Sequence, residues 1–208
     1  MLFRSRGIDD LLYLTISTGL GGAVISGGHL ITGPDDTAIE VGHAPISLDG
    51  PACSCGGSGH LESFVSGWAL AAAGGAAAKS GESPALARWV AANPSEAVSA
   101  REVSAAAAAG DGAAQAILAR ADLAIGRAVA GMVNIFNPER IIIGGSYAEA
   151  RWEEISARIL REIAEHAFKV PGSRVRIYPA ELGGDVSLAG CHPVVVGDRK
   201  STRLNSSH

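Results

Sequence analysis

The sequence lacks the features of membrane proteins and of nucleic-acid-binding proteins. Its 208 residues include 17 Lys and Arg against 21 Asp and Glu, which gives a formal net charge of −4, and no basic run occurs. A mildly acidic chain of this kind is a poor ligand for nucleic acid or for an anionic membrane. No apolar run reaches the ~20 residues that span a bilayer, and no charged segment followed by an apolar one marks a secretion signal. We therefore expect neither a membrane nor nucleic acid among its partners.

Cysteine and aromatic residues are also scarce. Three Cys provide no disulfide framework, which together with the missing secretion signal leads us to expect a reducing, cytoplasmic location. Aromatic residues make up 5% of the chain, whereas glycine occurs 27 times, and this composition favours close helix packing and many tight turns. Hydrophobic residues at 47% fit a globular core and argue against disorder.

The two ends of the chain differ from its body. Residues 198–208 are polar and aperiodic, and they resemble the in-frame translation of a sequencing adapter, while residues 1–5 resemble the opposite adapter. We therefore expect residues 6–197 to be an open-ended gene fragment bracketed by adapter sequence. An ordinary flexible tail is the alternative. Under the fragment hypothesis, a missing motif was cut off rather than never encoded.

The pattern of apolar residues predicts an α/β protein. Apolar, β-branched segments separated by glycine turns indicate an antiparallel meander followed by a βα unit. Strands are expected at 11–17, 23–26, 29–32, 140–144 and 175–180. A period of 3.6 and capping residues indicate helices. These are expected at 61–78, 84–93, after a cap at Ser99 or Ser104, from Asp111 to about 136, at 148–168 and near 183–190.

A long irregular stretch, residues 33–60, separates the meander from the first helix, and such stretches in compact domains are usually functional. Two of the three Cys and two of the six His lie in or next to it. Glycines at 56, 57 and 59 let the backbone fold back, and thiolate with imidazole forms closed tetrahedral zinc sites that fix a loop. We predict a structural Zn²⁺ held by His43, Cys53, Cys55 and His60. The alternative is a pair of ordinary thiols with loop histidines. Cys191 is expected in the core.

Two glycine-rich turns follow predicted strands, one at 18–22 and one at 143–146. Backbone N–H groups in such turns can line an anion cavity, to which Thr18 would add a hydroxyl. Hairpin turns also require glycine for backbone reasons alone. The chain contains no Gly-Lys-Ser/Thr of a Walker A loop. Two turns of this kind in one chain favour a bound nucleotide.

Taken together, the motifs TGLGG, AIEVGH, CSCGGSGHLE and NPERIIIGGS resemble the ROK family (repressor, open reading frame, kinase), whose kinase members resemble bacterial glucokinases and N-acetylhexosamine kinases. The resemblance covers about residues 8–197, and the Cys-x-Cys-Gly-x-x-Gly-x-x-Glu stretch is its most specific part. It implies an actin-like ATPase (ribonuclease H-like) fold. This chain would hold the C-terminal lobe, part of the cleft and a zinc-stapled loop at 43–60.

The resemblance also implies roles for individual residues. It places zinc on the same four ligands, hexose contacts on Glu40, His43 and Glu62, a phosphate loop on Thr18, Gly19 and Gly21, and adenosine-side glycines on Gly144 and Gly145. Carboxylates bind sugar hydroxyls by accepting hydrogen bonds. His43 would bind zinc through one nitrogen and donate to a hydroxyl through the other. The alternative for both glutamates is a solvated surface carboxylate.

One consequence for Glu62 is testable. We expect Glu62→Gln to lower kcat/KM for the hexose by about 10- to 100-fold. Nucleotide binding should change little, because the substitution leaves Thr18, Gly19 and the turn at Gly144 untouched.

The sequence departs from the family pattern at several points. His60 stands where a third Cys is usual, Ile39 stands where a Gly is usual, another Gly is missing near Asp36, and Ala23 replaces the third Gly of the phosphate loop. The first phosphate loop, Asp-x-Gly-Gly-Thr, and the Asn-Asp pair that carries the catalytic base are absent, and neither Asp9 nor Asp10 matches that pair. We therefore assign no catalytic residue and expect this chain to be inactive by itself.

The leading functional hypothesis is part of an ATP- and Mg²⁺-dependent kinase that phosphorylates glucose or an N-acetylhexosamine. We expect the full-length protein to be a homo-oligomer. A sugar-responsive repressor of the same family, with a helix-turn-helix upstream, is the second hypothesis, and it would bind DNA. TGLGG favours the kinase, because a repressor need not keep an ATP loop. A zinc-stabilised binding module without enzyme ancestry is the third hypothesis.

Overall fold

The computed structural model describes residues 7–181 of the chain. Both adapter-like ends, the helix expected near 183–190 and Cys191 lie outside the described residues. Within them, one five-stranded sheet has the order β3-β2-β1-β4-β5. The strands are β1 (Leu11–Ile16), β2 (Leu20–Ser26), β3 (His29–Leu30), β4 (Arg140–Gly144) and β5 (Arg176–Pro179).

The sheet confirms the predicted meander and βα unit. β2 pairs antiparallel with β1 and β3, whereas β4 lies parallel to β1 and to β5. The central strands β1 and β4 are buried along most of their length, as parallel strands covered on both faces require. One expectation was wrong: Gly21 and Gly22 belong to β2, opposite Thr15 and Leu14, so the turn after β1 is shorter than the TGLGG motif.

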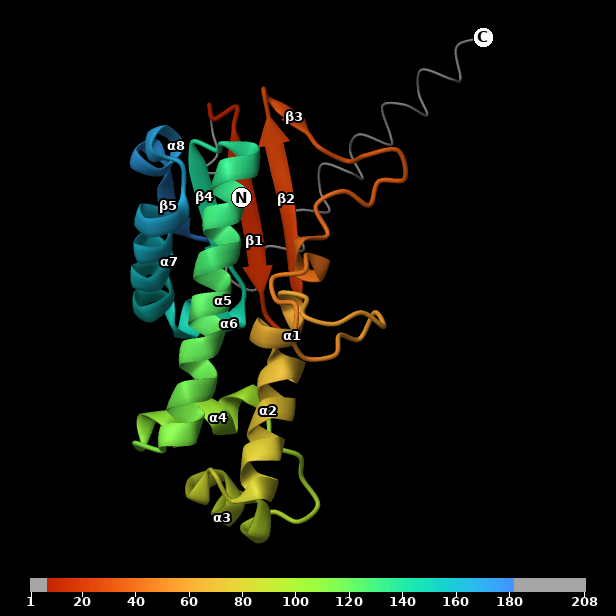
Figure 1. The fold of residues 1–208 in the computed structure, drawn as a ribbon, viewed down its shortest axis with the longest axis vertical. Helices are drawn as coiled ribbons and strands as arrows, with labels where there is room; N and C mark the ends of the chain where they lie inside the picture. Colours follow the sequence, from red (N-terminus) through yellow and green to blue (C-terminus); the bar gives the residue numbers. More distant parts are fainter. Residues whose placement is uncertain (1–6, 182–208) are drawn as a thin grey trace.

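Helices cover the sheet and extend beyond one of its ends (Figure 1). They are η1 (Val41–His43), α1 (Glu62–Val65), α2 (Gly67–Ser80), α3 (Pro84–Ala92), α4 (Ala100–Ala108), α5 (Gly112–Phe136), α6 (Ser146–Ala150), α7 (Trp152–His166) and α8 (Lys169–Arg174). The core joins β1 and β4 to α5 and α7, while α2, α3 and α4 form a group of helices past the sheet. None of the described helices is long and apolar enough to cross a bilayer.

Capping residues set most of the helix ends. Asp111 accepts the Ala114 N–H at the start of α5, as predicted. At α4 the cap is Ser99, in a capping box with Glu102, and not Ser104. The helix expected at 61–78 is two helices, because Ser66 is extended and accepts the Ala69 N–H to start α2.

Two further helix predictions were incomplete. The helix expected at 148–168 is divided at Arg151 into α6 and α7, and α8 was not predicted. Gly74 and Gly75 lie inside α2, which continues to Ser80 although glycine is a poor helix former. A Cβ at Gly74 would lie 3.0 Å from Val98 and in collision with Val103, so this glycine permits close helix packing.

The two positions where the family's glycines are missing both adopt left-handed backbone. Asp36 has φ 56° and Ile39 has φ 66°. A β-branched residue at positive φ is an outlier. The Ile39 side chain packs over Gly22 of β2. A Cβ built on that glycine would lie 3.3 Å from the Ile39 Cγ2. The backbone thus keeps a left-handed path without the glycines that would adopt it freely.

Asp36 provides a direct test of that strain. Asp36→Gly is expected to leave the free energy of unfolding unchanged or to raise it, because glycine relieves a left-handed conformation that costs an L-residue ~1–2 kcal/mol. Asp35→Gly, one residue away and without positive φ, should lower stability by about 0.4–1 kcal/mol through the unfolded-state entropy alone. Urea unfolding of both variants measures the difference, and equal losses would contradict the strain.

Candidate functional site

The 43–60 loop is folded back on itself by short bridges and glycines. Isolated β-bridges join Pro45 to His60 and Ala52 to Ser58, and the Cys53 N–H donates to the Gly57 carbonyl at 2.8 Å. Gly59 has φ 69°, and a Cβ there would collide with the Ser47 carbonyl oxygen. The backbone therefore closes only with glycine at this point, and the closure brings the two ends of the loop together.

The four predicted metal ligands converge at this closure. The His43 Nδ1 lies 3.6 Å from the Cys53 Sγ, and the His60 Nδ1 lies 3.2 Å from the Cys55 Sγ. One ligand atom from each of the four residues lies within 4.8 Å of the others. A tetrahedral zinc with bonds of about 2.0–2.3 Å places its ligands ~3.3–3.8 Å apart. Two thiols and two imidazoles in this arrangement fit zinc.

The thiol of Cys53 is prepared to lose its proton. Burial alone would raise its pKa, but the Cys55 backbone N–H and the side chains of His43, His60 and Cys55 lower it to about 6. The thiolate is the form that binds metals. His43 directs Nδ1 at Cys53, which leaves its Nε2 available to a ligand on the other side of the ring.

Glu62 starts α1 two residues after the predicted ligand His60, and its side chain is half-buried. Its Oε2 accepts the Leu20 backbone N–H at 3.0 Å, and its Oε1 accepts the Trp68 indole N–H at 3.3 Å. Gly42 packs against it, since a Cβ at Gly42 would lie 3.5 Å from Oε2. Glu40, two residues before Gly42, is exposed. The structure thus brings the three predicted hexose contacts to neighbouring segments.

A cavity of about 480 Å³ lies at the turn after β1, the turn whose Leu20 N–H binds Glu62. Hydroxyl groups, one guanidinium and the N-terminus of α4 line it, and none of its described lining residues is an Asp or Glu. The lining is Ser17, Thr18, Gly67, Ser99, Ala100, Arg101, Ser104, Ser146, Tyr147 and Ala150. The lining is mostly apolar, and its polar groups are hydroxyls and a guanidinium without a carboxylate, which suits a ligand that carries an anionic group.

The two glycine turns meet at this cavity, although their residues take different places. The Ser17 and Ser146 hydroxyls are 3.0 Å apart, which joins the turn after β1 to the turn after β4. Thr18 lines the cavity, whereas Gly19 faces Glu62 and Gly21 lies in β2. Gly144 ends β4, and Gly145 has φ 93° and lies against Ile16. We take the contribution of Gly19, Gly21, Gly144 and Gly145 to be backbone geometry.

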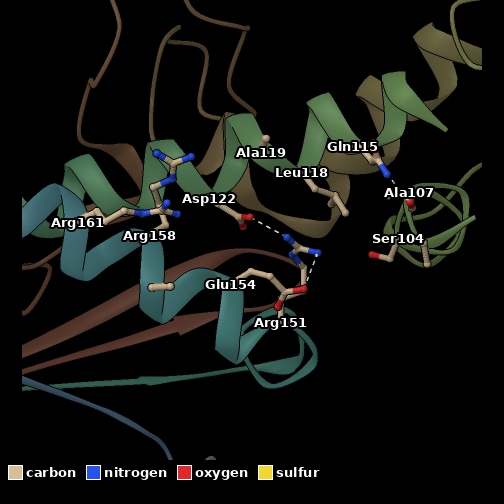
Figure 2. A pocket seen from close by; sticks show the side chains of 12 residues that line it. Ser104, Ala107, Gln115, Leu118, Ala119, Asp122, Arg151, Glu154, Arg158 and Arg161 are labelled. Atoms are coloured by element: carbon tan, nitrogen blue, oxygen red, sulfur yellow. Dashed lines mark hydrogen bonds and ion pairs between the residues drawn. The ribbon is translucent and has the colours of Figure 1, made fainter. Parts of the chain in front are cut away.

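Sequence reasoning missed a buried charge network behind the second turn. Asp122 of α5 accepts the Tyr147 hydroxyl at 3.1 Å and a guanidinium N–H of Arg151 at 2.7 Å, and Arg151 also lies 3.8 Å from Glu154. Burial and the Asp122 charge raise the pKa of Tyr147. Figure 2 shows the Asp122, Arg151 and Glu154 side chains at a second cavity, of about 410 Å³. An Asp at helical spacing among apolar residues of α5 was the available signal.

Known proteins resemble this chain in sequence and in fold. The ROK family model matches residues 2–196. A glucokinase of Thermotoga maritima is 40% identical over 145 residues, which are 70% of this chain and 45% of that protein. A xylose repressor of Caldicellulosiruptor bescii is 33% identical over 195 residues, 93% of this chain and 48% of that protein. This chain therefore spans about half the length of these relatives.

Solved structures agree with the sequence matches. A ROK family glucokinase from Streptomyces griseus, solved in complex with glucose and AMPPNP, superposes with a TM-score of 0.73 at 27% identity. The superposition covers 91% of this chain and 61% of the other.

Proposed function

Because this chain belongs to the ROK family, we propose that it is part of an ATP- and Mg²⁺-dependent hexose kinase acting on glucose or an N-acetylhexosamine. The observation that carries the proposal is the junction of two sites. Ser17 and Thr18 of the turn after β1 line the cavity together with Ser146, and Leu20 at the end of the same turn donates its N–H to the Glu62 carboxylate. A nucleotide in the cavity and a hexose at the carboxylate would then be neighbours, as phosphoryl transfer requires.

We assign the hexose side to Glu40, His43 and Glu62. The two carboxylates would accept hydrogen bonds from sugar hydroxyls, and the His43 Nε2–H would donate one to a hydroxyl oxygen. His43, Cys53, Cys55 and His60 would hold the zinc, whose four filled positions would fix the loop that presents these groups. The loop itself is the element that needs fixing, because few of its side chains reach the core.

We assign the nucleotide side to Thr18, the Gly19–Gly21 segment and the turn at Gly144 and Gly145. The hydroxyls of Thr18 and Ser146 and the N-terminus of α4 would bind phosphate and ribose oxygens. Mg²⁺ bound with the nucleotide would neutralise charge on the transferred phosphoryl group. We expect the full-length kinase to be a cytoplasmic homo-oligomer.

The general base is assigned outside this chain. Asp9 and Asp10 precede β1, at the opposite end of that strand from Thr18, and Asp10 accepts N–H and O–H bonds from Gly27 and Ser26 in the β2–β3 hairpin. Neither carboxylate can take a proton from a hexose beside Glu62. The 208-residue chain alone is therefore expected to phosphorylate no hexose.

The test is an assay of the protein encoded by this gene together with its upstream coding sequence. We expect ATP-dependent phosphorylation of at least one of glucose, N-acetylglucosamine and N-acetylmannosamine, and no product from the 208-residue chain. The similarity to a xylose repressor favours a second candidate, a sugar-responsive repressor. Binding of its own promoter DNA, released by sugar, with no phosphorylated product would replace the kinase by the repressor.

A further inference from the structure

The Glu62 carboxylate is held from two sides by N–H donors that belong to different elements. Leu20, the first residue of β2, binds Oε2 at 3.0 Å, and Trp68 in the first turn of α2 binds Oε1 at 3.3 Å. The extended Ser66 between α1 and α2 turns the chain so that Trp68 comes back to Glu62. Both Glu62 and Trp68 are only half-buried, so a ligand can still reach the carboxylate.

Two protein donors leave part of the carboxylate free. An ionised carboxylate offers about four lone-pair directions, of which these bonds use two. An indole N–H can only donate and carries no charge, so Trp68 orients the carboxylate without neutralising it. An amide side chain could not replace this group, because it would present an NH₂ to one of the two donors.

The same junction of α1 and α2 holds the turn after β1 at both ends. The Gly67 N–H donates to the Ser17 carbonyl at 2.9 Å, and Glu62 accepts the Leu20 N–H. Thr18 and Gly19 lie between these two bonds. Thr18 lines the 480 Å³ cavity, and a Cβ at Gly19 would lie 3.1 Å from the Glu62 Oε2. The expectation that replacing Glu62 leaves this turn untouched is therefore wrong.

We propose that Trp68 is a positioning residue, and that its contact with Glu62 couples hexose binding to nucleotide binding through the Leu20 N–H. This inference rests on the proposed kinase function. A hexose that orders the Glu62 carboxylate also fixes the 17–20 turn before the nucleotide phosphates arrive, so the second ligand loses less freedom on binding. By linkage, the nucleotide raises hexose affinity by the same factor.

The first experiment uses the 208-residue chain without ligand and compares Trp68→Phe with the matched control Trp89→Phe in α3. Hydrogen exchange of the Leu20 amide, followed by NMR, is expected to accelerate by about 3- to 10-fold in Trp68→Phe, as a hydrogen bond of ordinary strength predicts. The Trp89→Phe rate should equal that of the parent sequence. An unchanged Leu20 rate in Trp68→Phe would overturn the inference, whatever the enzyme does.

The second experiment uses the protein that includes the upstream region, with glucose and a non-hydrolysable ATP analogue as probes in calorimetry. Glucose is expected to tighten nucleotide binding by about 5-fold or more, within the usual range of such couplings. In Trp68→Phe that factor should fall towards one, whereas Trp89→Phe should keep it. If Trp68 had only a structural role, Trp68→Phe would weaken the binding of both ligands and leave the coupling factor between them unchanged.

The outcomes separate the two proposals. Retention of the full coupling factor in Trp68→Phe, with hexose still bound, would overturn the inference and leave the kinase proposal intact. Failure of the unmodified protein to bind any of the three hexoses would overturn the kinase proposal and this inference with it.

Discussion

Cys53→Ser is expected to release the metal and to melt the 43–60 loop. A serine oxygen is a poor zinc ligand, and the site would lose its one buried ligand, the Cys53 thiolate of lowered pKa, which leaves three ligands. Partners that only orient a ligand are worth about 10- to 100-fold in metal affinity, so the loss of a ligand itself should exceed ~100-fold. Because metal binding and loop folding are one equilibrium, the thermal midpoint should fall as well.

Metal analysis of untagged protein and thermal unfolding with and without a chelator measure this effect. The unmodified chain is expected to carry one equivalent of zinc and to lose stability when a chelator is added. Cys53→Ser should contain little zinc, and its thermal midpoint should not change with the chelator. Cys191→Ser is the matched control, since it makes the same chemical change at a cysteine that is not one of the four predicted ligands. A purified parent chain with well under one equivalent of zinc, or a Cys53→Ser variant that keeps it, would disprove the site.

Gly145→Ala is the second change with a large expected effect. Gly145 has φ 93° and ψ 155°, a region that is essentially restricted to glycine and costs other residues ~1–3 kcal/mol. An added Cβ would also collide with the Ile16 carbonyl oxygen and lie 2.7 Å from the carbonyl carbon, and overpacking of this kind costs about 1–3 kcal/mol. The free energy of unfolding should therefore fall by roughly 2–5 kcal/mol.

The control for this variant is another glycine-to-alanine change. Gly75 lies inside α2, and a Cβ there would have no neighbour within 4 Å. Gly75→Ala should stabilise the chain by about 0.5–1 kcal/mol, since alanine is the better helix former. Urea unfolding of the 208-residue chain compares the two. If both variants lose similar stability, the tight approach of the turn to β1 is not what requires glycine at 145.

Local signals in the sequence were sufficient to predict several helices and strands. The α3 helix from Pro84 and the α5 helix after Asp111 follow from a capping side chain and from apolar residues at helical spacing. The apolar run at 11–17 predicted β1. Helix and strand periodicity depend on neighbouring residues, so this information is present in the chain before it folds.

Other features have causes that lie far away in the sequence. Gly74 stays helical because α2 packs closely on Val98 and Val103. Gly21 and Gly22 become strand residues because β1 offers a ladder of hydrogen bonds to them. In both cases the tertiary partner outweighs the intrinsic preference of glycine.

The candidate site also combines a part that the sequence predicts with a part that only the tertiary structure decides. The four predicted metal ligands lie within an 18-residue loop, 43–60, so their spacing and their chemistry were sufficient to predict that they converge. The bond between Glu62 and the Leu20 N–H joins residues 42 apart, and that between Tyr147 and Asp122 joins residues 25 apart. Those contacts were decided by the tertiary fold, which brings Glu62 of α1 to the start of β2 and Tyr147 of α6 to Asp122 of α5. A hydrogen bond depends on position within a few tenths of an ångström, and only the assembled core sets positions that finely across separate elements.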